Sequence, residues 1–503
     1  MKICFFLHRR FTQLGHAMAC HIRREYPDTE FCAYVGTRQS LAWLEGQTNI
    51  AYTGLLLDED VHLRLHDEKI DYAYLRWLEN EYGIPNLWPY LYIDRVVMNG
   101  QLVREYPYDV PSLSREDMLR KLQVQARAII AFLDEQKPDV VVTAVIGSVG
   151  SMLLYHIAKK RGIRTIHTEF ARIGNRIAFS ENYRTFTWVK ERFAEIRAGS
   201  SSPERAEAER FVHEFREAPT HYDEDTLPEF YGRRGRSSHL RFLLPKNLAH
   251  SIAWYASVVS KHALRRGMHD YTETLVWWEM WDKLRRKVRG LIGFDDLYSP
   301  FDPTTRFAYY PLHIDPEIAT LLLGPYYTNQ LELIRATARS LPIDMLLYVK
   351  EHPGMVGFRT RRYYQEILRI PNVRLLPPSV SGLTLAGTAA LTVTITSTNA
   401  WESIILKKPV ITFGDVFFND IPGVVRCHGW EEFPYLVKKQ LEEWQHDEEA
   451  LLQYVSALLE DSVVVDFSAL WNRGASAEEV MRDEGMQALS RKLAEKAGLA
   501  ARI

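Results

Sequence analysis

Short runs of hydrophobic residues alternate along this chain with segments whose apolar residues recur at helical spacing. Bounded apolar runs are typical of buried strands, and the wider spacing is typical of helices that bury one face. In the first part of the chain, the predicted strands are residues 2–7, 30–36, 139–147 and 164–170. Residues 148–162 show helical spacing and end at Gly162, a residue that commonly stops helices. This alternation predicts a parallel sheet with helices on both faces.

The same alternation begins again near residue 305. Here the predicted strands are residues 306–313, 344–352, 373–377, 390–396 and 409–414. Helical spacing lies between them, at residues 324–342, 360–370 and 398–408. The sequence therefore predicts an α/β fold with two Rossmann-like domains, at residues 1–190 and 301–465.

The pattern between these domains is different. Residues 191–300 predict long helices and loops without a strand, and residues 466–503 predict one polar C-terminal helix. Within the middle segment, residues 231–290 hold 13 Lys and Arg against 4 Asp and Glu. Four tryptophans lie in the same stretch: Trp254, Trp277, Trp278 and Trp281. One interpretation is a solvated helical insertion or linker. The other is a basic, aromatic surface that meets an anionic membrane or a lipid-linked acceptor.

The composition narrows the class of protein. A chain of 503 residues is too long for one core, and its net charge of −2 points to no particular partner. Nothing in the chain favours nucleic acid as a partner. The four cysteines lack metal-binding spacing, and no apolar run is long enough to span a membrane. These features predict a cytoplasmic protein with reduced thiols, with membrane contact limited to the inner face of the plasma membrane.

Polar residues follow four of the predicted strands in the second domain. Ligands of open parallel sheets bind beyond the carboxyl ends of the strands, so these residues are expected to face one crevice. They are His313, Lys350 to Pro353, Thr396 to Asn399, and Asp415.

The stretch from Thr396 to Thr398 has a direct physical interpretation. Hydroxyl side chains at a helix N-terminus lie beside free backbone N–H groups and the positive end of the helix dipole, which together bind phosphate. The alternative is that Ser397 or Thr398 only caps the helix. Lys350 and His352 on the neighbouring rim favour the phosphate site. Glu402, in the first turn, is a candidate acceptor for a ribose diol or a surface carboxylate that complements the dipole.

Several motifs in this region resemble the capsule and surface polysaccharide biosynthesis family. They are "PLHIDPE" (311–317), "VKEHPG" (349–354), "PNVRLL" (371–376), "TSTNAWESIILKKPVITFGDVFF" (396–418) and "IPGV" (421–424). Members of that family are GT-B glycosyltransferases, in which two Rossmann-like domains face a central cleft, and some transfer Kdo from CMP-Kdo. The His-Pro pair and the Ser/Thr motif are also similar to those of bacterial sialyltransferases and polysialyltransferases, which bind CMP-sugars.

The resemblance implies roles for individual residues. His352, Ser397 and Thr398 would hold the donor phosphate, and Glu402 the ribose. The strand-end argument adds His313, Lys350 and Thr396 to the residues expected to bind the donor nucleotide and its phosphate. Asn399 and Trp401 depart from the family, because many relatives carry a glycine after the Thr of the motif. Because of this difference, the detailed geometry of the phosphate site is not carried over from the family.

The first domain is expected to hold the acceptor and the general base. Gly15 and His16 are similar to the Gly-His turn between strand and helix in several GT-B transferases. Glu169 and Gly174 resemble a segment that follows a strand in the capsule family, and a carboxylate there is placed to deprotonate an acceptor hydroxyl. The catalytic candidates are therefore Glu169 and His16. The acceptor-binding candidates are Gly15, Arg172 and Arg176. The alternative for Glu169 is a solvated or salt-bridged residue beside Arg172 and Arg176.

The resulting hypothesis is a metal-independent sugar transferase. It takes a nucleotide sugar as substrate, needs no cofactor, and extends a capsule, O-antigen, lipopolysaccharide or other lipid-linked acceptor. No DxD motif stands at a strand end, and "FDD" at 294–296 lies in a loop. Three alternatives remain: a teichoic-acid-type glycerol- or ribitol-phosphate transferase, a nucleotide-sugar 2-epimerase, and a non-catalytic member of a polysaccharide assembly complex.

Overall fold

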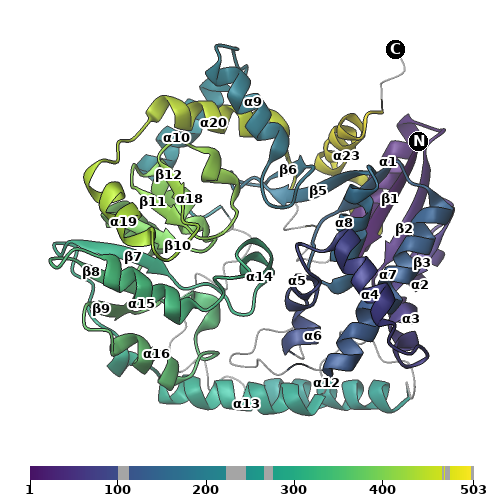
Figure 1. Cartoon of the computed structure of the whole chain (residues 1–503), viewed down its shortest axis with the longest axis horizontal. Coiled ribbons are helices and arrows are strands. Elements are labelled where there is room, and N and C mark those ends of the chain that lie inside the picture. The colour runs from purple at the N-terminus through teal and green to yellow at the C-terminus, as the bar shows by residue number, and fades with distance from the viewer. Residues whose placement is uncertain are drawn as a thin grey trace. The chain divides into compact units, whose positions relative to one another are not determined.

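A computed structural model describes residues 1–99, 111, 113–222, 245–264, 276–466, 470 and 476–499. The chain folds into two compact units, each built on a sheet with flanking helices (Figure 1). The first unit contains Met1–Met98, Pro111–Phe211 and the described residues from Glu449 onward. The second contains the described residues of Val212–Glu448. The predicted α/β class with two mainly parallel sheets is confirmed.

The first unit contains a seven-stranded sheet of order β13-β6-β5-β4-β1-β2-β3. Its parallel strands are β1 (Lys2–Leu7), β2 (Glu30–Val35), β3 (Leu55–Leu57), β4 (Val140–Thr143) and β5 (Arg164–Phe170). Strand β6 (Arg176–Ser180) runs antiparallel to β5, and β13 (Ser462–Val464) runs antiparallel to β6. Strands β3, β6 and β13 were not predicted.

Helices α1 (Phe11–Glu25), α7 (Arg115–Gln136) and α8 (Val149–Lys160) accompany this sheet. Ser148 begins α8 with a capping box to Ser151, and Gly162 follows its end with a φ of 73°. The shorter elements are α2 (Arg38–Glu45), α3 (Asp58–Leu63), α4 (Tyr72–Tyr82), α5 (Trp88–Tyr92), α6 (Arg95–Asn99) and the 3₁₀ helix η1 (Arg64–His66).

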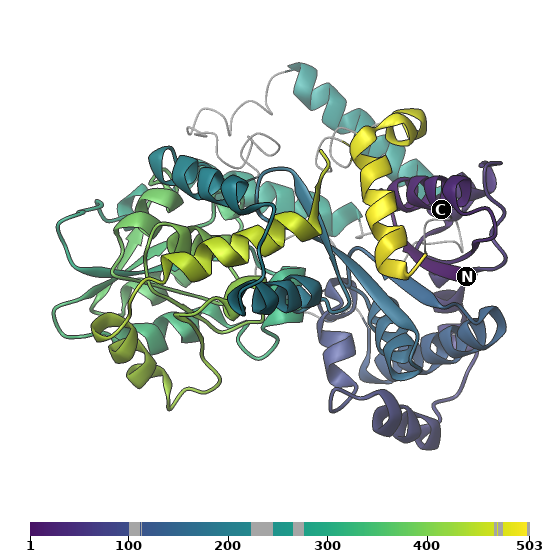
Figure 2. The same cartoon turned by 90° about the horizontal axis from the view of Figure 1, so that it is seen from above.

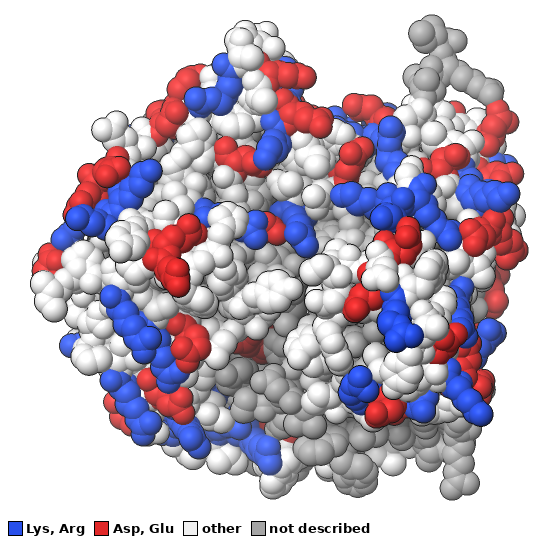
Figure 3. Space-filling model, in the orientation of Figure 1, with Lys and Arg blue, Asp and Glu red and all other residues white. Residues whose placement is uncertain are grey.

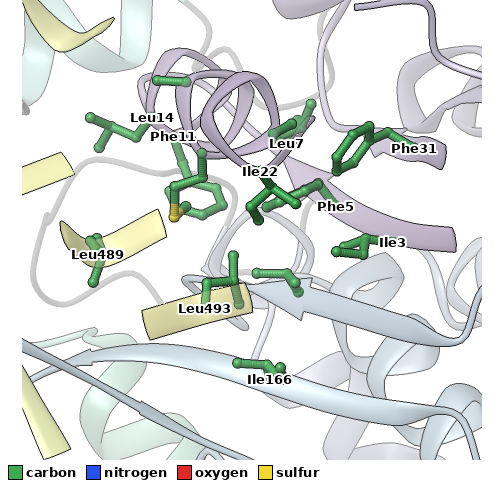
Figure 4. Close-up of a cluster of buried hydrophobic side chains, with 14 of the residues drawn as sticks. Ile3, Phe5, Leu7, Phe11, Leu14, Ile22, Phe31, Ile166, Leu489 and Leu493 are labelled. Atoms are coloured by element: carbon green, nitrogen blue, oxygen red, sulfur yellow. The ribbon is translucent and has the colours of Figure 1, made fainter. Parts of the chain in front are cut away.

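The core of the first unit joins both ends of the chain. Side chains of β1, α1, β2 and β5 pack against Leu489 and Leu493 of α23 (Glu484–Ala497), as Figure 4 shows. Figure 2 shows α23 alongside α1. The prediction of one polar C-terminal helix was therefore wrong. Helix α22 (Ala477–Arg482) precedes α23, Asp483 caps the second helix, and a buried apolar face binds it to α1.

The second unit contains a six-stranded, all-parallel sheet of order β12-β11-β10-β7-β8-β9. Its strands are β7 (Phe307–Pro311), β8 (Leu346–Lys350), β9 (Val373–Leu376), β10 (Leu391–Thr394), β11 (Val410–Thr412) and β12 (Val424–Arg426). The helices are α14 (Ile318–Leu323), α15 (Gln330–Ser340), α16 (Arg361–Leu368), α17 (Gly382–Thr388), α18 (Thr398–Ile405) and α19 (Phe433–Glu442), with 3₁₀ turns η3 (Asp295–Leu297), η4 (Pro353–Met355) and η5 (Phe417–Asp420). Because the strands are parallel, their carboxyl ends meet at one edge.

The described residues of the middle segment are mainly helical, as predicted, and contain no strand; residues 223–244 and 265–275, which include part of the predicted basic stretch, lie outside the described residues. It holds α9 (Thr187–Arg197), α10 (Arg205–Glu217), α12 (Pro245–Leu264) and α13 (Val276–Ile292). Helix α9 packs on α20 (Glu448–Asp461): the rings of Phe193 and Tyr454 lie 5.3 Å apart, and Arg192 Nε lies 2.7 Å from Glu460. The compact units thus divide the chain differently from the predicted segments 1–190, 191–300, 301–465 and 466–503.

The surface carries mixed charge. On the face shown in Figure 3, basic and acidic side chains of the described residues are interspersed, in keeping with the net charge of −2. Among the described residues, no helix is long and apolar enough to cross a membrane.

Candidate functional site

The carboxyl ends of β7 and β10 are joined through His313. Its backbone N–H donates to Gln330 Oε1 at 2.7 Å, and its Nε2 lies 2.9 Å from Thr394 Oγ1. The same nitrogen accepts the Thr396 N–H at 3.4 Å, so it is unprotonated. Burial and the charge of Arg359 lower the pKa of His313 to about 3. His313 therefore fixes the loop before α18 as a neutral ring rather than as a cation.

Lys350 is the last residue of β8, and its side chain is buried. Its Nζ donates to the Glu351 carbonyl oxygen at 3.3 Å. Burial lowers the pKa of Lys350 to about 8, and the charges of Glu351 and Glu402 offset part of this shift. With this pKa the amine is still mostly protonated at neutral pH, and an anion bound beside it would raise the pKa again.

Glu351, for which the sequence offered no role, holds the VKEHPG loop in place. It is fully buried and forms an ion pair with Arg359, which is also fully buried. Its other carboxylate oxygen accepts from Tyr364 Oη at 2.6 Å, and the His352 N–H donates to the oxygen shared with Arg359 at 2.6 Å. One buried carboxylate therefore fixes both the end of β8 and the backbone of His352.

His352 has a defined ring state. It caps the 3₁₀ turn η4, and its Nδ1 accepts the Gly354 N–H at 3.1 Å. Because Nδ1 is an acceptor, the proton of the neutral ring lies on Nε2, which is then a donor. Pro353 is the first residue of this turn, where its missing N–H costs nothing.

The start of α18 combines a helix cap with an unsatisfied hydroxyl group. Ser397 is the N-cap, since its side chain accepts the Asn399 N–H at 3.2 Å, which supports the capping interpretation of this residue. Thr398 is the first helical residue and is half-buried. Thr396 Oγ1 is buried and has no hydrogen-bond partner among the described residues. Buried hydroxyl groups are rarely left unpaired, so Thr396 stays a candidate for binding a polar ligand.

Glu402 is buried and already has partners. One of its oxygens lies 2.7 Å from His221 Nδ1, and the other accepts from Asn399 Nδ2. Tyr309 Oη in turn donates to Asn399 Oδ1 at 3.2 Å. His221 was missed by the sequence analysis because it lies 181 positions from Glu402. A ribose at this carboxylate would have to share it with His221 and Asn399.

Gly15 and His16 do not lie at a strand-to-helix turn, and that expectation was wrong. Both lie inside α1, where a Cβ on Gly15 would come within 2.5 Å of Leu7 Cδ2. The glycine therefore permits close packing of α1 on β1. His16 is buried, with Nδ1 3.0 Å from Tyr52 Oη, and burial lowers its pKa to about 4.

Glu169 lies near the carboxyl end of β5 with its side chain 35% exposed. Arg172 Nη2 donates to it at 3.3 Å, and His167 Nε2 lies 3.9 Å away. The expected ion pair between Glu169 and Arg176 is absent among the described contacts. Arg176 lies on β6 and donates to the Ser462 carbonyl oxygen at 3.4 Å. The structure thus brings together Glu169 and Arg172.

Within the described ranges, no group of three or more His, Cys, Asp or Glu side chains is arranged to hold a metal ion. Asp415, the last of the predicted strand-end residues, forms an ion pair with Arg426.

A comparison with protein families matches a segment that lies mostly in the second unit. Residues 322–454 match the model of a family described as capsule polysaccharide biosynthesis protein. The predicted family resemblance is confirmed. The matched residues include Lys350, His352, the start of α18 and Glu402, whereas His313 lies outside them. No curated protein matches the chain.

Solved structures with similarity to this chain include two Kdo transferases and an epimerase. Thermosulfurimonas dismutans KpsC, beta Kdo 2,7 transferase, has a TM-score of 0.36 at 12% identity over 79% of this chain and 95% of that one. The beta Kdo 2,4 transferase of the same protein has a TM-score of 0.33 at 13% identity over 63% and 78%. The UDP-GlcNAc 2-epimerase of Neisseria meningitidis has a TM-score of 0.26 at 11% identity over 98% and 100%.

Lys350 should make stability depend on pH. Its folded pKa of about 8 lies below the ordinary value of 10.5, so between these values the unfolded chain binds more protons. The free energy of unfolding should therefore rise with pH across this window, by up to about 3 kcal/mol. Urea denaturation from pH 7.5 to 10.5 should show this slope in the wild type but not in Lys350→Met. Lys438→Met, at an exposed lysine, should keep the wild-type slope.

Proposed function

We propose that this protein is a glycosyltransferase of surface polysaccharide synthesis, with a nucleotide sugar as donor. The donor in this proposal is a CMP-sugar such as CMP-Kdo, and the acceptor is a growing capsular, O-antigen or lipopolysaccharide glycan or its lipid-linked precursor. The observation that carries the proposal is the buried Thr396 hydroxyl group, which precedes the N-cap of α18 and has no hydrogen-bond partner in the described part of the chain. It lies in the segment that matches the capsule family.

The donor phosphate would bind at the carboxyl edge of the second sheet. Thr396 Oγ1 and the positive end of the α18 dipole lie on one side. His352 Nε2–H and Lys350 Nζ are donors on the rim formed by β8. Hydrogen bonds of this kind to a charged group each contribute about 1.5–3 kcal/mol. Three or four of them stabilise a departing phosphate without any contribution from a metal ion.

The acceptor hydroxyl group would be activated in the first unit. Its oxygen forms the new bond to the anomeric carbon, while the bond from that carbon to the donor phosphate oxygen breaks. The hydroxyl proton passes to Glu169, and the phosphate leaves with the bonding electron pair. Arg172 holds the carboxylate of Glu169 in position. Glu169 is the better base candidate, because His16 is buried inside α1.

Nucleotide binding provides the direct test. Calorimetry with CMP-, UDP-, GDP- and dTDP-sugars should identify one nucleotide class that binds, and a donor at 100 times its dissociation constant should stabilise the fold by about 2.7 kcal/mol. His352→Ala should weaken binding of that donor by roughly 10- to 150-fold, because one hydrogen bond to charged phosphate is lost. His213→Ala, at a histidine 70% exposed in the same unit, is the matched control and should bind as the wild type does.

Other outcomes separate the alternatives. Stabilisation by CDP-glycerol or CDP-ribitol alone would indicate polyol-phosphate transfer, and a changed nucleotide sugar without any acceptor would indicate epimerisation. A wild-type protein that binds no nucleotide would refute the transferase and leave a role in assembly. Equal affinity of His352→Ala and wild type would refute the role of this histidine.

A further inference from the structure

The solvent-facing side of α13 is apolar, the reverse of an ordinary surface helix. Six of its large hydrophobic residues are between 37% and 60% exposed: Met280, Trp281, Leu284, Val288, Leu291 and Ile292. At about 100° per residue, they form one stripe that spans about 120° of the helix circumference. Exposed apolar stripes of this size mark sites where a protein meets a partner or a membrane.

Cations border this stripe on both sides. On the same helical wheel, Arg285 flanks one edge and Lys287 the other. Arg285 also lies over the Trp281 ring, 5.1 Å from its centroid. The one described carboxylate of the helix, Asp282, is buried and paired with Arg286 at 2.6 Å. The exposed side of α13 therefore presents apolar and positively charged groups.

Helix α12 extends the same kind of surface. It contains no Asp or Glu, and most of its described side chains are exposed, including Leu248, Ile252 and Val259 on one helical face. Lys283 of α13 joins the two helices, with its Nζ 4.3 Å from the centroid of the Trp254 ring. Few of the described side chains of α12 therefore take part in packing within the fold.

The other side of α13 is fixed to the loop that follows VKEHPG. Arg289 Nη1 donates to the Phe358 carbonyl oxygen at 2.6 Å, and the Arg286 guanidinium lies 4.3 Å from the Phe358 ring centroid. Phe358 directly precedes Arg359, the partner of Glu351. The apolar stripe is thus held at a defined position relative to the loop that carries His352.

We propose that α12 and the apolar stripe of α13 form a docking surface for an anionic phospholipid bilayer. In this arrangement α13 lies in the plane of the interface, with the stripe among the upper acyl chains and Trp281 at the level of the headgroups. Arg285 and Lys287 lie at the height of the lipid phosphates. Charge complementarity favours this occupant over a second copy of the chain, since two such cation-flanked stripes would repel each other. The proposal stands independently of the transferase activity.

Vesicle co-sedimentation tests the proposal with the full chain. Wild type should pellet with vesicles that contain phosphatidylglycerol and remain largely in solution with phosphatidylcholine alone. Leu284→Gln/Val288→Gln should lower the partition coefficient on anionic vesicles by more than tenfold, because two apolar side chains no longer insert. Arg285→Gln/Lys287→Gln should lower it by about fivefold for each cation removed.

A matched variant controls for general surface effects. Tyr435→Gln/Lys438→Gln changes one exposed apolar residue and one exposed cation on α19 and should sediment as wild type does. Wild type that stays in solution with both vesicle types would overturn the proposal. So would equal binding by the stripe variant. A dimer in light scattering that Leu284→Gln/Val288→Gln abolishes, without vesicle binding, would assign the surface to a second copy instead. Nucleotide affinity measured on the same variants should stay unchanged, which keeps this test separate from that of the transferase.

Discussion

Replacing Glu169 with glutamine should lower the rate of sugar transfer by about 10²- to 10⁴-fold, the usual contribution of a general base. The amide keeps the size of the side chain and an oxygen that can accept from Arg172, so the local structure is preserved. What it loses is the ability to take a proton from the acceptor hydroxyl group. Nucleotide affinity should remain that of wild type, since the donor candidates lie on the second sheet.

The measurement is the transfer rate at saturating donor, with nucleotide binding followed in parallel by calorimetry. Glu181→Gln is the matched control, because Glu181 is also a partly exposed carboxylate of the first unit and pairs with Arg164 at 3.9 Å. It should retain the wild-type rate. A wild-type rate in Glu169→Gln would place the base elsewhere. A weakened donor affinity would mean that this residue supports binding rather than proton transfer.

The long buried strands were predictable because burial on both faces makes them continuously apolar. Strand β5 lies at residues 164–170, as predicted from the sequence. Strands β3, β12 and β13 have only three residues each and lack the longer apolar run that made the equally short β11 predictable. Strand β6 follows β5 through a tight reversal at Arg172 and Gly174, both with positive φ, and the sequence pattern after β5 did not predict a further strand.

The C-terminal region illustrates a signal that was present in the sequence. Met486, Leu489, Leu493 and Ala497 recur at helical spacing, and all four are buried against the first sheet and α1. Their stripe is narrow and the surrounding residues are charged, so composition alone suggested a polar helix. Periodicity was the better guide than composition.

The position of the candidate site was predicted from the rule that ligands bind at the carboxyl ends of parallel strands. The contacts between its side chains involve residues that are distant in the sequence. Polar residues after apolar strands identified Lys350, His352 and the start of α18. The partners of Glu351 and Glu402 could not be predicted from the sequence, because the residues around Arg359 and His221 do not indicate which carboxylate each side chain contacts. Such pairs form only when helices, strands and loops that are distant in the sequence pack together, so the hydrophobic pattern does not predict them.

Arg359→Met should lower the free energy of unfolding of the second unit by about 3–5 kcal/mol, the usual cost of removing one member of a buried ion pair. The substitution leaves the fully buried carboxylate of Glu351 without its cation. It also removes the donor to the His313 carbonyl oxygen, so two strand ends lose a common support. Urea denaturation followed by circular dichroism measures the effect.

Two further variants show whether the effect comes from the buried charge. Arg306→Met breaks the exposed pair with Asp344, in which the side chains are 47% and 58% exposed, and should cost at most about 1 kcal/mol. Glu351→Gln/Arg359→Met should be more stable than Arg359→Met alone, because the double variant no longer buries an uncompensated charge. If the double variant were the less stable of the two, packing of the Arg359 side chain rather than its charge would hold the loop. If Arg359→Met unfolded within 1 kcal/mol of wild type, the ion pair would not organise this rim, and His352 would need another support.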